Sequence, residues 1–256
     1  MADLAAIRAK IAALETGARA DRGSLPFGDP RIDAHLPGGG LPLGRWHELA
    51  GEGLETETAA APSAFAALMA APLACRGEAV WVMRRDDLWA PGLSGLGFPA
   101  QRLIQVCARD EAEAFSVMED ALGAVGVAAV LGEVEEIDLT AGRRLQLACE
   151  KRGATAFVLR RRPYGGRPRR EPAGSAAATR WRIASAPSEP GPNEFGLGAP
   201  RWRAVLERCR GGRGGQWLFE AETAYSMEAG DGAHPLRLVA QLADRQLAPA
   251  QPRRAA

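Results

Sequence analysis

Residues 37–51 read PGGGLPLGRWHELAG, and the rest of the chain can be placed relative to them. The glycines predict a turn, the run from Trp46 to Ala50 predicts a short strand, and Gly51 begins a second turn. In nucleotide-binding α/β proteins such a strand leads into a phosphate-binding loop, G-x-x-x-x-G-K-[ST], with a helix behind it. Here residues 51–58 read GEGLETET and stand in the position of that loop.

The residues of this loop do not suit a phosphate. Gly51 and Thr58 match the first and last positions of the motif, but Thr56 replaces the second glycine and Glu57 replaces the lysine. The lysine supplies positive charge, and bare backbone N–H groups curl around the phosphates. With Glu52 and Glu55 nearby, three carboxylates would face the polyanion, and one like-charge contact costs up to about 4 kcal/mol. We therefore expect no nucleotide cofactor and no ATPase activity.

A wider set of residues resembles the entry to the core of RecA-like recombinases. The set comprises Ile32, Asp33, Gly38, Gly39, Gly40, Leu41, Pro42, Gly44, Arg45, Glu48, Leu49 and Gly51. Residues 201–213, which read RWRAVLERCRGGR, and the following Trp217 are similar to the ImuA family, the RecA-like proteins of bacterial translesion-synthesis operons. The likeness covers roughly residues 25–222. It implies an α/β, RecA-like core: a mainly parallel central sheet with helices on both faces and an antiparallel extension near the C-terminus.

The pattern of the remaining chain agrees with this fold class. Strands are expected at 78–83, 125–131, 155–159 and 179–185, and helices at 62–76, 110–123 and 140–152; Leu103–Cys107 is a further short apolar run. Strands that alternate with helices in this way indicate βαβ units and a parallel sheet. Residues 202–209 and 216–221 flank a glycine-rich turn and predict a β-hairpin.

We divide the chain into three segments. Residues 1–22 predict an amphipathic helix and a linker-like stretch that continues to Gly28; the helix either packs on the core or docks on another protein. Residues 23–222 form the predicted RecA-like core. Residues 223–256 are expected to be a tail with a possible short helix at 234–246, whose apolar stripe would be Leu236, Val239 and Leu242.

Arginines are concentrated between residues 160 and 182, where Glu171 is the one acid. They are Arg160, Arg161, Arg162, Arg167, Arg169, Arg170, Arg180 and Arg182. Glycine, proline and serine predict a loop over residues 163–178, which the RecA resemblance matches to a segment that contacts single-stranded DNA. Tyr164 and Trp181 could stack a base. Contact with DNA, docking on an acidic protein partner, and a solvated surface loop stay open as interpretations.

The resemblance also locates two acids. A RecA-like ATPase holds Mg²⁺ with an aspartate at the end of the strand at 125–131, where this chain has Gly132 and Glu133. Asp86 stands near the position of the glutamate that activates water in that family. Without a bound nucleotide we expect neither acid to be catalytic, and we expect no metal site.

Composition excludes several other classes. The 256 residues carry a formal net charge of +1, so no global field draws the chain to nucleic acid or membrane. No apolar run is long enough to span a membrane, and a cytoplasmic, nucleoid-associated protein is expected. The cysteines and histidines lack the spacing of metal ligands or of a hydrolytic triad, and buried thiols are expected at Cys75, Cys107, Cys149 and Cys209.

These observations predict a non-catalytic adaptor of SOS-induced translesion DNA synthesis. The resemblance implies as partners an ImuB-like protein, RecA and an error-prone polymerase III α-type subunit, with single-stranded DNA as a further possibility. One alternative is a weak, atypical DNA-dependent ATPase that uses Thr58 with Glu133 or Asp86. Another is a cell-division inhibitor resembling SulA, which has a RecA-like frame without a working phosphate-binding loop.

Overall fold

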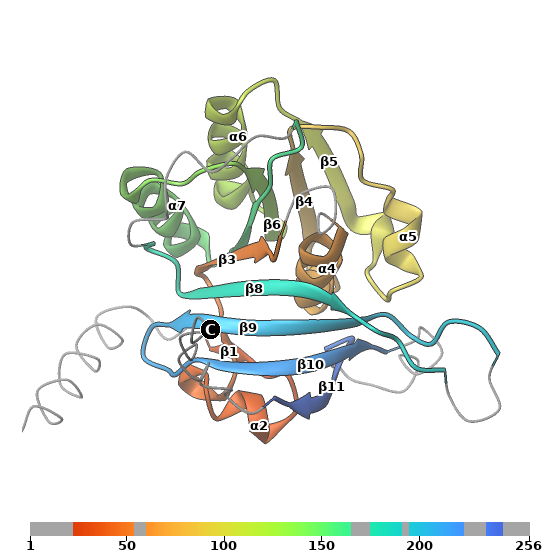
Figure 1. The fold of residues 1–256 in the computed structure, drawn as a ribbon. Helices are drawn as coiled ribbons and strands as arrows, with labels where there is room; N and C mark the ends of the chain where they lie inside the picture. The colour runs from red at the N-terminus through yellow and green to blue at the C-terminus, as the bar shows by residue number, and fades with distance from the viewer. Residues whose placement is uncertain (1–22, 54–59, 165–174, 191–194, 223–233, 243–256) are drawn as a thin grey trace, which may run out of the picture.

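The computed structural model describes residues 23–53, 60–164, 175–190, 195–222 and 234–242 (Figure 1). Its main feature is a nine-stranded sheet with the strand order β11-β10-β9-β8-β3-β7-β6-β4-β5. The strands are β3 (Trp46–Gly51), β4 (Glu78–Met83), β5 (Leu103–Cys107), β6 (Val127–Val134), β7 (Thr155–Arg160), β8 (Thr179–Ala186), β9 (Arg201–Cys209), β10 (Gly215–Ala221) and β11 (Leu236–Gln241).

The sheet has a parallel and an antiparallel half. Strands β5, β4, β6, β7, β3 and β8 run parallel to their neighbours, whereas β9, β10 and β11 continue the sheet in antiparallel sense. In Figure 1 the long strands β8, β9 and β10 lie below β3 and the strands beyond it. The predicted fold class, with its antiparallel C-terminal extension, is therefore confirmed.

Helices cover both faces of the parallel half. On one face α6 (Glu111–Gly123) and α7 (Leu139–Arg152) pack with a cluster that contains Trp46, Met118 and Val130. On the other face α4 (Ala60–Ala74) packs with a larger cluster that includes Phe65 and Trp81. Because both faces are covered, the central strands are almost continuously apolar, as parallel sheets require.

Local capping explains the helix boundaries. The Asp110 carboxylate accepts a hydrogen bond from the Glu113 N–H (2.8 Å), and the Asp138 carboxylate does the same for the Ala141 N–H (2.7 Å). Gly153 ends α7 in the left-handed conformation, with φ at 89°. The helices expected at 110–123 and 140–152 are confirmed. Pro72 lies inside α4, which ends two residues later at Ala74.

An N-terminal module precedes the main sheet. It contains β1 (Ser24–Leu25), α2 (Pro30–Asp33), a 3₁₀ turn η1 (Pro37–Gly39) and β2 (Leu41–Pro42), with β1 and β2 paired antiparallel. A Cβ atom at Gly40 would lie 2.6 Å from the Leu25 backbone, so only glycine allows this approach. Residues 23–28 are therefore not linker, since Leu25 and Phe27 are buried in the core. Two shorter elements, α5 (Ala90–Ser94) and η2 (Ala100–Arg102), connect β4 to β5.

The helix expected at 234–246 is wrong over the residues described there. Residues 236–241 form β11, which pairs with β10 and extends the sheet beyond the predicted core boundary at residue 222. Leu236 and Leu238 are buried, two residues apart, as on a strand. The apolar residues fit the period of a helix and also that of a strand. Pairing with the backbone of β10 favours the strand.

Several predictions fall outside the described residues. These concern the helix in residues 1–22, residues 165–174 with Arg167, Arg169 and Arg170, and the tail from residue 243. Within the described residues, no helix combines the length and apolar character needed to cross a membrane.

Candidate functional site

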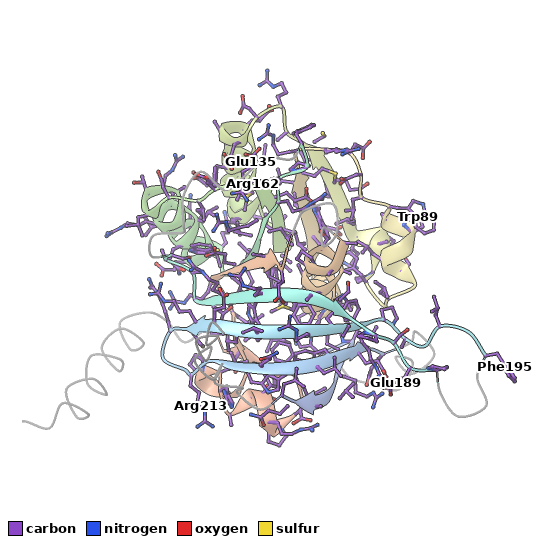
Figure 2. The ribbon with its side chains drawn as sticks, viewed as in Figure 1. Trp89, Glu135, Arg162, Glu189, Phe195 and Arg213 are labelled. Carbon is purple, nitrogen blue, oxygen red and sulfur yellow. The ribbon has the colours of Figure 1, made fainter. Side chains whose placement is uncertain are left out.

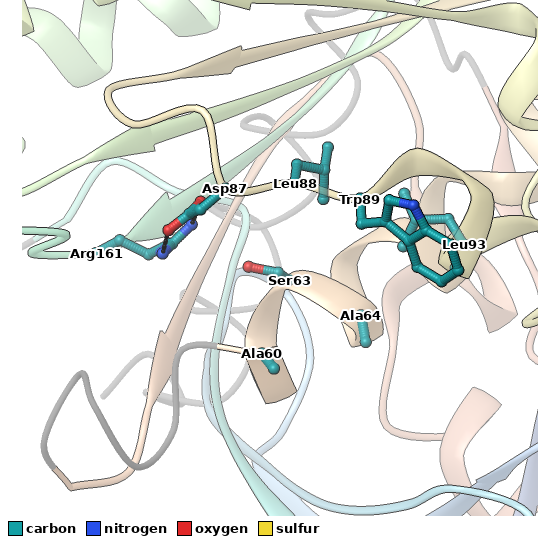
Figure 3. Close-up of a pocket in the computed structure, with 9 residues that line it drawn as sticks. Ala60, Ser63, Ala64, Asp87, Leu88, Trp89, Leu93 and Arg161 are labelled. Atoms are coloured by element: carbon teal, nitrogen blue, oxygen red, sulfur yellow. Dashed lines mark hydrogen bonds and ion pairs between the residues drawn. The ribbon is translucent and has the colours of Figure 1, made fainter.

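The carboxyl ends of β3, β4, β6 and β7 meet at one edge of the sheet, where open α/β folds bind their ligands. The first turn of α4 lies at this edge, beside an open pocket of about 310 Å³ (Figure 3). The pocket is lined by Ala60, Ser63, Ala64, Asp87, Leu88, Trp89, Gly92, Leu93 and Arg161. Most of these side chains are apolar, and the two charged ones form an ion pair with each other.

Arg161 is the centre of a charge network at the inner end of this pocket. Its Nη1 lies 2.9 Å from Glu133 Oε1 on β6, and its Nη2 lies 2.9 Å from Asp87 Oδ2 after β4. The Trp81 Nε1–H donates to the same Glu133 oxygen at 3.0 Å. Glu133 is 1% exposed, and this burial raises the pKa of its carboxyl, although Arg161 opposes the rise.

This arrangement bears directly on the magnesium position. Glu133 stands where a RecA-like ATPase would hold Mg²⁺, and its described partners are the Arg161 guanidinium and the Trp81 indole. A cation bound at that point would be repelled by the guanidinium of Arg161, which already pairs with Glu133. Asp86, the acid expected near the water-activating position, is exposed, and its neighbour Asp87 belongs to the network instead.

Only the beginning of residues 51–58, the expected counterpart of a phosphate-binding loop, lies within the described residues. Gly51 ends β3, and the Glu52 N–H donates to the Ile183 carbonyl of β8 (3.1 Å). The Glu52 carboxylate forms an ion pair with Arg203 of β9. Glu52 is therefore tied to the antiparallel half of the sheet. The positions of Thr56, Glu57 and Thr58 lie outside the described residues.

Comparison with curated proteins identifies the family. Over 243 residues the chain is 60% identical to Protein ImuA of Caulobacter vibrioides strain NA1000 / CB15N, a match that covers 93% of this chain and 98% of that protein. The same values hold for Protein ImuA of C. vibrioides strain ATCC 19089 / CIP 103742 / CB 15. This chain belongs to the ImuA family.

The structural comparison agrees with the fold. The crystal structure of the RadB recombinase matches with a TM-score of 0.52 at 18% sequence identity, over 77% of this chain and 96% of RadB. At that identity the likeness supports a RecA-like fold alone. No family model matches the chain.

All the described arginines of the 160–182 segment are paired in this ImuA-family chain. Arg160 and Arg180 flank Glu48 of β3, at 3.5 Å and 3.2 Å, and Glu48 is 1% exposed. Arg162 lies 3.8 Å from Glu136, and Arg182 lies 2.6 Å from Glu207. The sequence showed a single opposing acid because the others lie on β3, β6 and β9 or directly after β4 and β6. Glu48 was missed as a site residue, although a glutamate inside an apolar strand was a visible signal.

The aromatic residues near this segment differ in accessibility. Trp181, expected as a stacking platform, is fully buried against Phe65 and Trp217, so that expectation is wrong. Its alternation with Arg180 and Arg182 along β8 directs it into the core. Tyr164 is exposed, and its hydroxyl donates to the Arg84 carbonyl (2.8 Å). Trp89 is 74% exposed at the mouth of the pocket, and the sequence analysis did not single it out.

The histidine and cysteine side chains differ in their burial. His47 is buried, with Nδ1 2.8 Å from the Thr179 hydroxyl and Nε2 3.0 Å from the Pro42 carbonyl. Cys75 and Cys107 are exposed and Cys209 is partly buried, so the expectation of four buried thiols holds for Cys149 alone. Across the described parts of the chain, no group of three or more His, Cys, Asp or Glu side chains could hold a metal ion.

Proposed function

We propose that this protein is a non-catalytic, RecA-like adaptor of SOS-induced translesion DNA synthesis. Its membership of the ImuA family supports a place in the mutagenesis system of which ImuA and ImuB are parts. As an adaptor, the chain binds its partners through the surfaces of a RecA-like core and does not hydrolyse nucleotide. It bridges the error-prone polymerase machinery and RecA.

The Arg161–Glu133 ion pair is the observation that carries this proposal. Divalent metal needs a carboxylate that can turn its charge toward the ion, whereas Glu133 is already neutralised at 2.9 Å by a buried guanidinium. Moving Arg161 away would leave a buried charge without compensation, which typically costs about 3–5 kcal/mol. Glu57, which stands at the position of the loop lysine, also disfavours nucleotide binding.

Nucleotide binding and turnover test the absence of catalysis. Titration of the full chain with fluorescent Mg-ATP should give no saturable binding, and phosphate release should stay at background with or without single-stranded DNA. The variant Thr56→Gly/Glu57→Lys restores the loop chemistry and should still show no hydrolysis, because Arg161 keeps its place beside Glu133. Micromolar binding with hydrolysis by the native chain would instead establish an atypical ATPase.

The bridging role needs a separate experiment. Partners proposed from the family are an ImuB-like protein, RecA and a polymerase III α-type subunit. Purified full chain on a biosensor should bind at least two of them, and the second should still bind after the first is saturated. Binding of one partner alone would reduce the adaptor to an accessory subunit. Filamentation of cells on overexpression, without an effect on damage-induced mutation frequency, would favour the division-inhibitor alternative.

A further inference from the structure

The outward face of α7 carries leucines at positions where a helix that faces only solvent would carry polar side chains. Leu139 is 62% exposed and Leu147 is 57% exposed. Among the described helices, α7 alone has exposed large apolar side chains. The helix lies at the outer left of the molecule in Figure 1, and its side chains extend away from the sheet in Figure 2. Leu145 and Cys149 already bury the inner face, so the exposed leucines add nothing to the core.

Cations alternate with these leucines along a single line on the helix. The line consists of exposed side chains four residues apart, which are Leu139, Arg143, Leu147 and Lys151. We call these four residues the α7 ridge. At a rise of 1.5 Å per residue the ridge is about 18 Å long, or roughly three helical turns. Ridges with this spacing are the surfaces that pack into the grooves of a second helix.

The positive charge of this face is not balanced within the described residues. The nearby acids have other partners, since Glu119 of α6 lies 2.7 Å from Arg144 and Glu150 lies 2.6 Å from Arg45. No described acid forms an ion pair with the remaining cations of α7, which are Arg143, Lys151 and Arg152.

Stabilisation of the helix itself explains only part of this pattern. Lys151 and Arg152 stand in the last turn, where positive charge is favourable next to the helix C-terminus. Arg143 is in the middle of the helix, and the leucines carry no charge. The alternation of leucines with cations along one ridge therefore favours a surface that binds another molecule.

We propose that the α7 ridge binds an acidic, amphipathic helix of a partner protein. Its apolar side chains cover Leu139 and Leu147, and its carboxylates pair with Arg143 and Lys151. The inference rests on the proposed function, because an adaptor needs surfaces that bind other proteins. A nucleic acid is a poorer occupant, since phosphates would leave the leucines uncovered and the ridge has no aromatic side chain to stack a base.

A synthetic peptide serves as the probe. It is a fluorescein-labelled helix of about 20 residues in which leucine and glutamate alternate along one i, i+4 line. Fluorescence anisotropy with the full chain should show saturable binding with a Kd of about 10–100 µM, as expected of a small, transient interface. The affinity should fall as the salt concentration rises. A peptide of the same composition in scrambled order should bind at least about tenfold more weakly.

Reversing the charge of the ridge tests the ionic contribution. The variant Arg143→Glu/Lys151→Glu should bind the probe at least about tenfold more weakly. A peptide with lysine in place of glutamate should bind this variant more tightly than it binds the native chain, which a loss of folding could not produce. The matched control is Arg76→Glu/Arg213→Glu, and its affinity for the probe should stay within about twofold of the native value.

The two control arginines carry the same kind of charge on other elements. Arg76 follows α4 on the opposite face of the sheet, and Arg213 lies in the turn between β9 and β10 (Figure 2). Both are exposed, and neither forms an ion pair with a described residue. A purely global effect of charge would weaken binding equally in the ridge variant and in this control.

Replacing the leucines tests the apolar contribution. The variant Leu139→Ser/Leu147→Ser should weaken binding of the probe at least about fivefold, because apolar anchors dominate small interfaces. The control Phe195→Ser/Leu197→Ser removes two apolar side chains that are 103% and 96% exposed and should have no effect. Phe195 lies on the opposite side of the molecule from α7 in Figure 2. Thermal denaturation followed by circular dichroism checks that each variant is folded.

Two results would overturn the inference. One is no saturable binding of the probe to the native chain up to about 200 µM, or equal binding by the ridge variants. The other is binding of a fluorescein-labelled oligothymidylate that Arg143→Glu/Lys151→Glu abolishes, which would make the ridge a nucleic-acid site. The biosensor measurement separates these failures from failure of the proposed function. If the partners bind and the peptide does not, the ridge assignment alone is wrong. If the peptide binds and none of the partners does, the adaptor proposal fails and the ridge assignment stands.

Discussion

At the scale of single residues, buried charge decides what the site can do. Glu133 lies at the end of an apolar strand with Arg161 and Trp81 as its described hydrogen-bond partners. Glu48 is similarly held between Arg160 and Arg180. Buried ion pairs of this kind add little net stability, but removing one member leaves the other charged in a dry environment.

Replacing Arg161 tests this network. We expect Arg161→Met to lower the free energy of unfolding by about 3–5 kcal/mol, because Glu133 remains buried without its counter-charge. Urea denaturation followed by circular dichroism measures the change. Adding Glu133→Gln should recover most of the loss. The control Arg144→Ala removes an ion pair with Glu119 in which the Arg144 side chain is 62% exposed, and it should cost less than about 1 kcal/mol. Equal losses for Arg161→Met and Arg144→Ala would contradict the prediction.

His47 predicts a pH dependence of stability. Burial lowers the pKa of its imidazole from 6.5 to about 4, with a smaller contribution from Arg45. The unfolded chain takes up a proton below pH 6.5 and the folded chain does not, so stability is full above pH 6.5 and is lost as the pH falls toward 4. By pH 5 the loss should reach about 2 kcal/mol.

The comparison of the native chain with His47→Gln isolates this effect. Unfolding free energies measured at pH 7.5 and pH 5 should converge, with the native chain losing its advantage at the lower pH. His234, whose pKa burial also lowers to about 4, contributes equally to both proteins. Glu133, whose pKa is raised, titrates with the opposite sign in both. Parallel pH profiles for the two proteins would show that His47 does not titrate as the geometry implies.

At the scale of secondary-structure elements, β11 shows how a neighbour can decide conformation. Leu236, Val239 and Leu242 have helical spacing, whereas Leu236 and Leu238 have strand spacing. An isolated helix of this length is marginal in water. The edge of β10 presents a row of backbone hydrogen-bonding groups. When residues 236–241 form a strand, the backbone groups of both strands are paired. The structure therefore has β11 at the edge of the sheet.

Two adjacent substitutions distinguish the strand from the helix. Leu238→Ser removes a side chain that is 8% exposed, and we expect a loss of about 2–3 kcal/mol in unfolding free energy. Val239→Ser changes the partly exposed opposite face and should cost under about 1 kcal/mol. Thermal denaturation of both variants provides the measurement. A helix with the stripe Leu236, Val239 and Leu242 would reverse the order of the two effects.

At the scale of the whole molecule, the sheet brings acids from distant segments to the arginines of residues 160–182. Arg160, Arg161, Arg162, Arg180 and Arg182 all have carboxylate partners. Their charge is largely balanced, so they offer little attraction to a phosphate backbone. If this chain binds single-stranded DNA, we expect Arg167, Arg169 and Arg170 to supply the contacts.

Salt dependence tests that expectation. The variant Arg167→Ala/Arg169→Ala/Arg170→Ala should weaken binding of single-stranded DNA and reduce the slope of log K against log salt by about two units, at roughly 0.7 per phosphate contact. Fluorescence anisotropy at several salt concentrations measures the slope. The variant Arg143→Ala/Arg144→Ala/Arg152→Ala on α7 removes the same charge and should leave the slope unchanged. Equal slopes for all three proteins would assign residues 167–170 to protein contact or to no role.

The sequence by itself determined the order and type of most elements. The caps at Asp110 and Asp138, the turn at Gly153 and the apolar periods are local, and each is written within a few residues. The acidic substitutions in residues 51–58 are equally local, and the prediction that the chain lacks ATPase activity rests on them. The resemblance to the ImuA family also rests on short runs of residues.

The tertiary structure alone decided which side chains meet. Glu48 and Arg180 are 132 residues apart, and only the placement of β3 beside β8 brings them to 3.2 Å. The burial of Trp181 and the formation of a strand at residues 236–241 depend on the same long-range order. The charge balance and the exposure of a side chain depend on what surrounds it. Strand order, more than the neighbouring residues in the sequence, sets these surroundings.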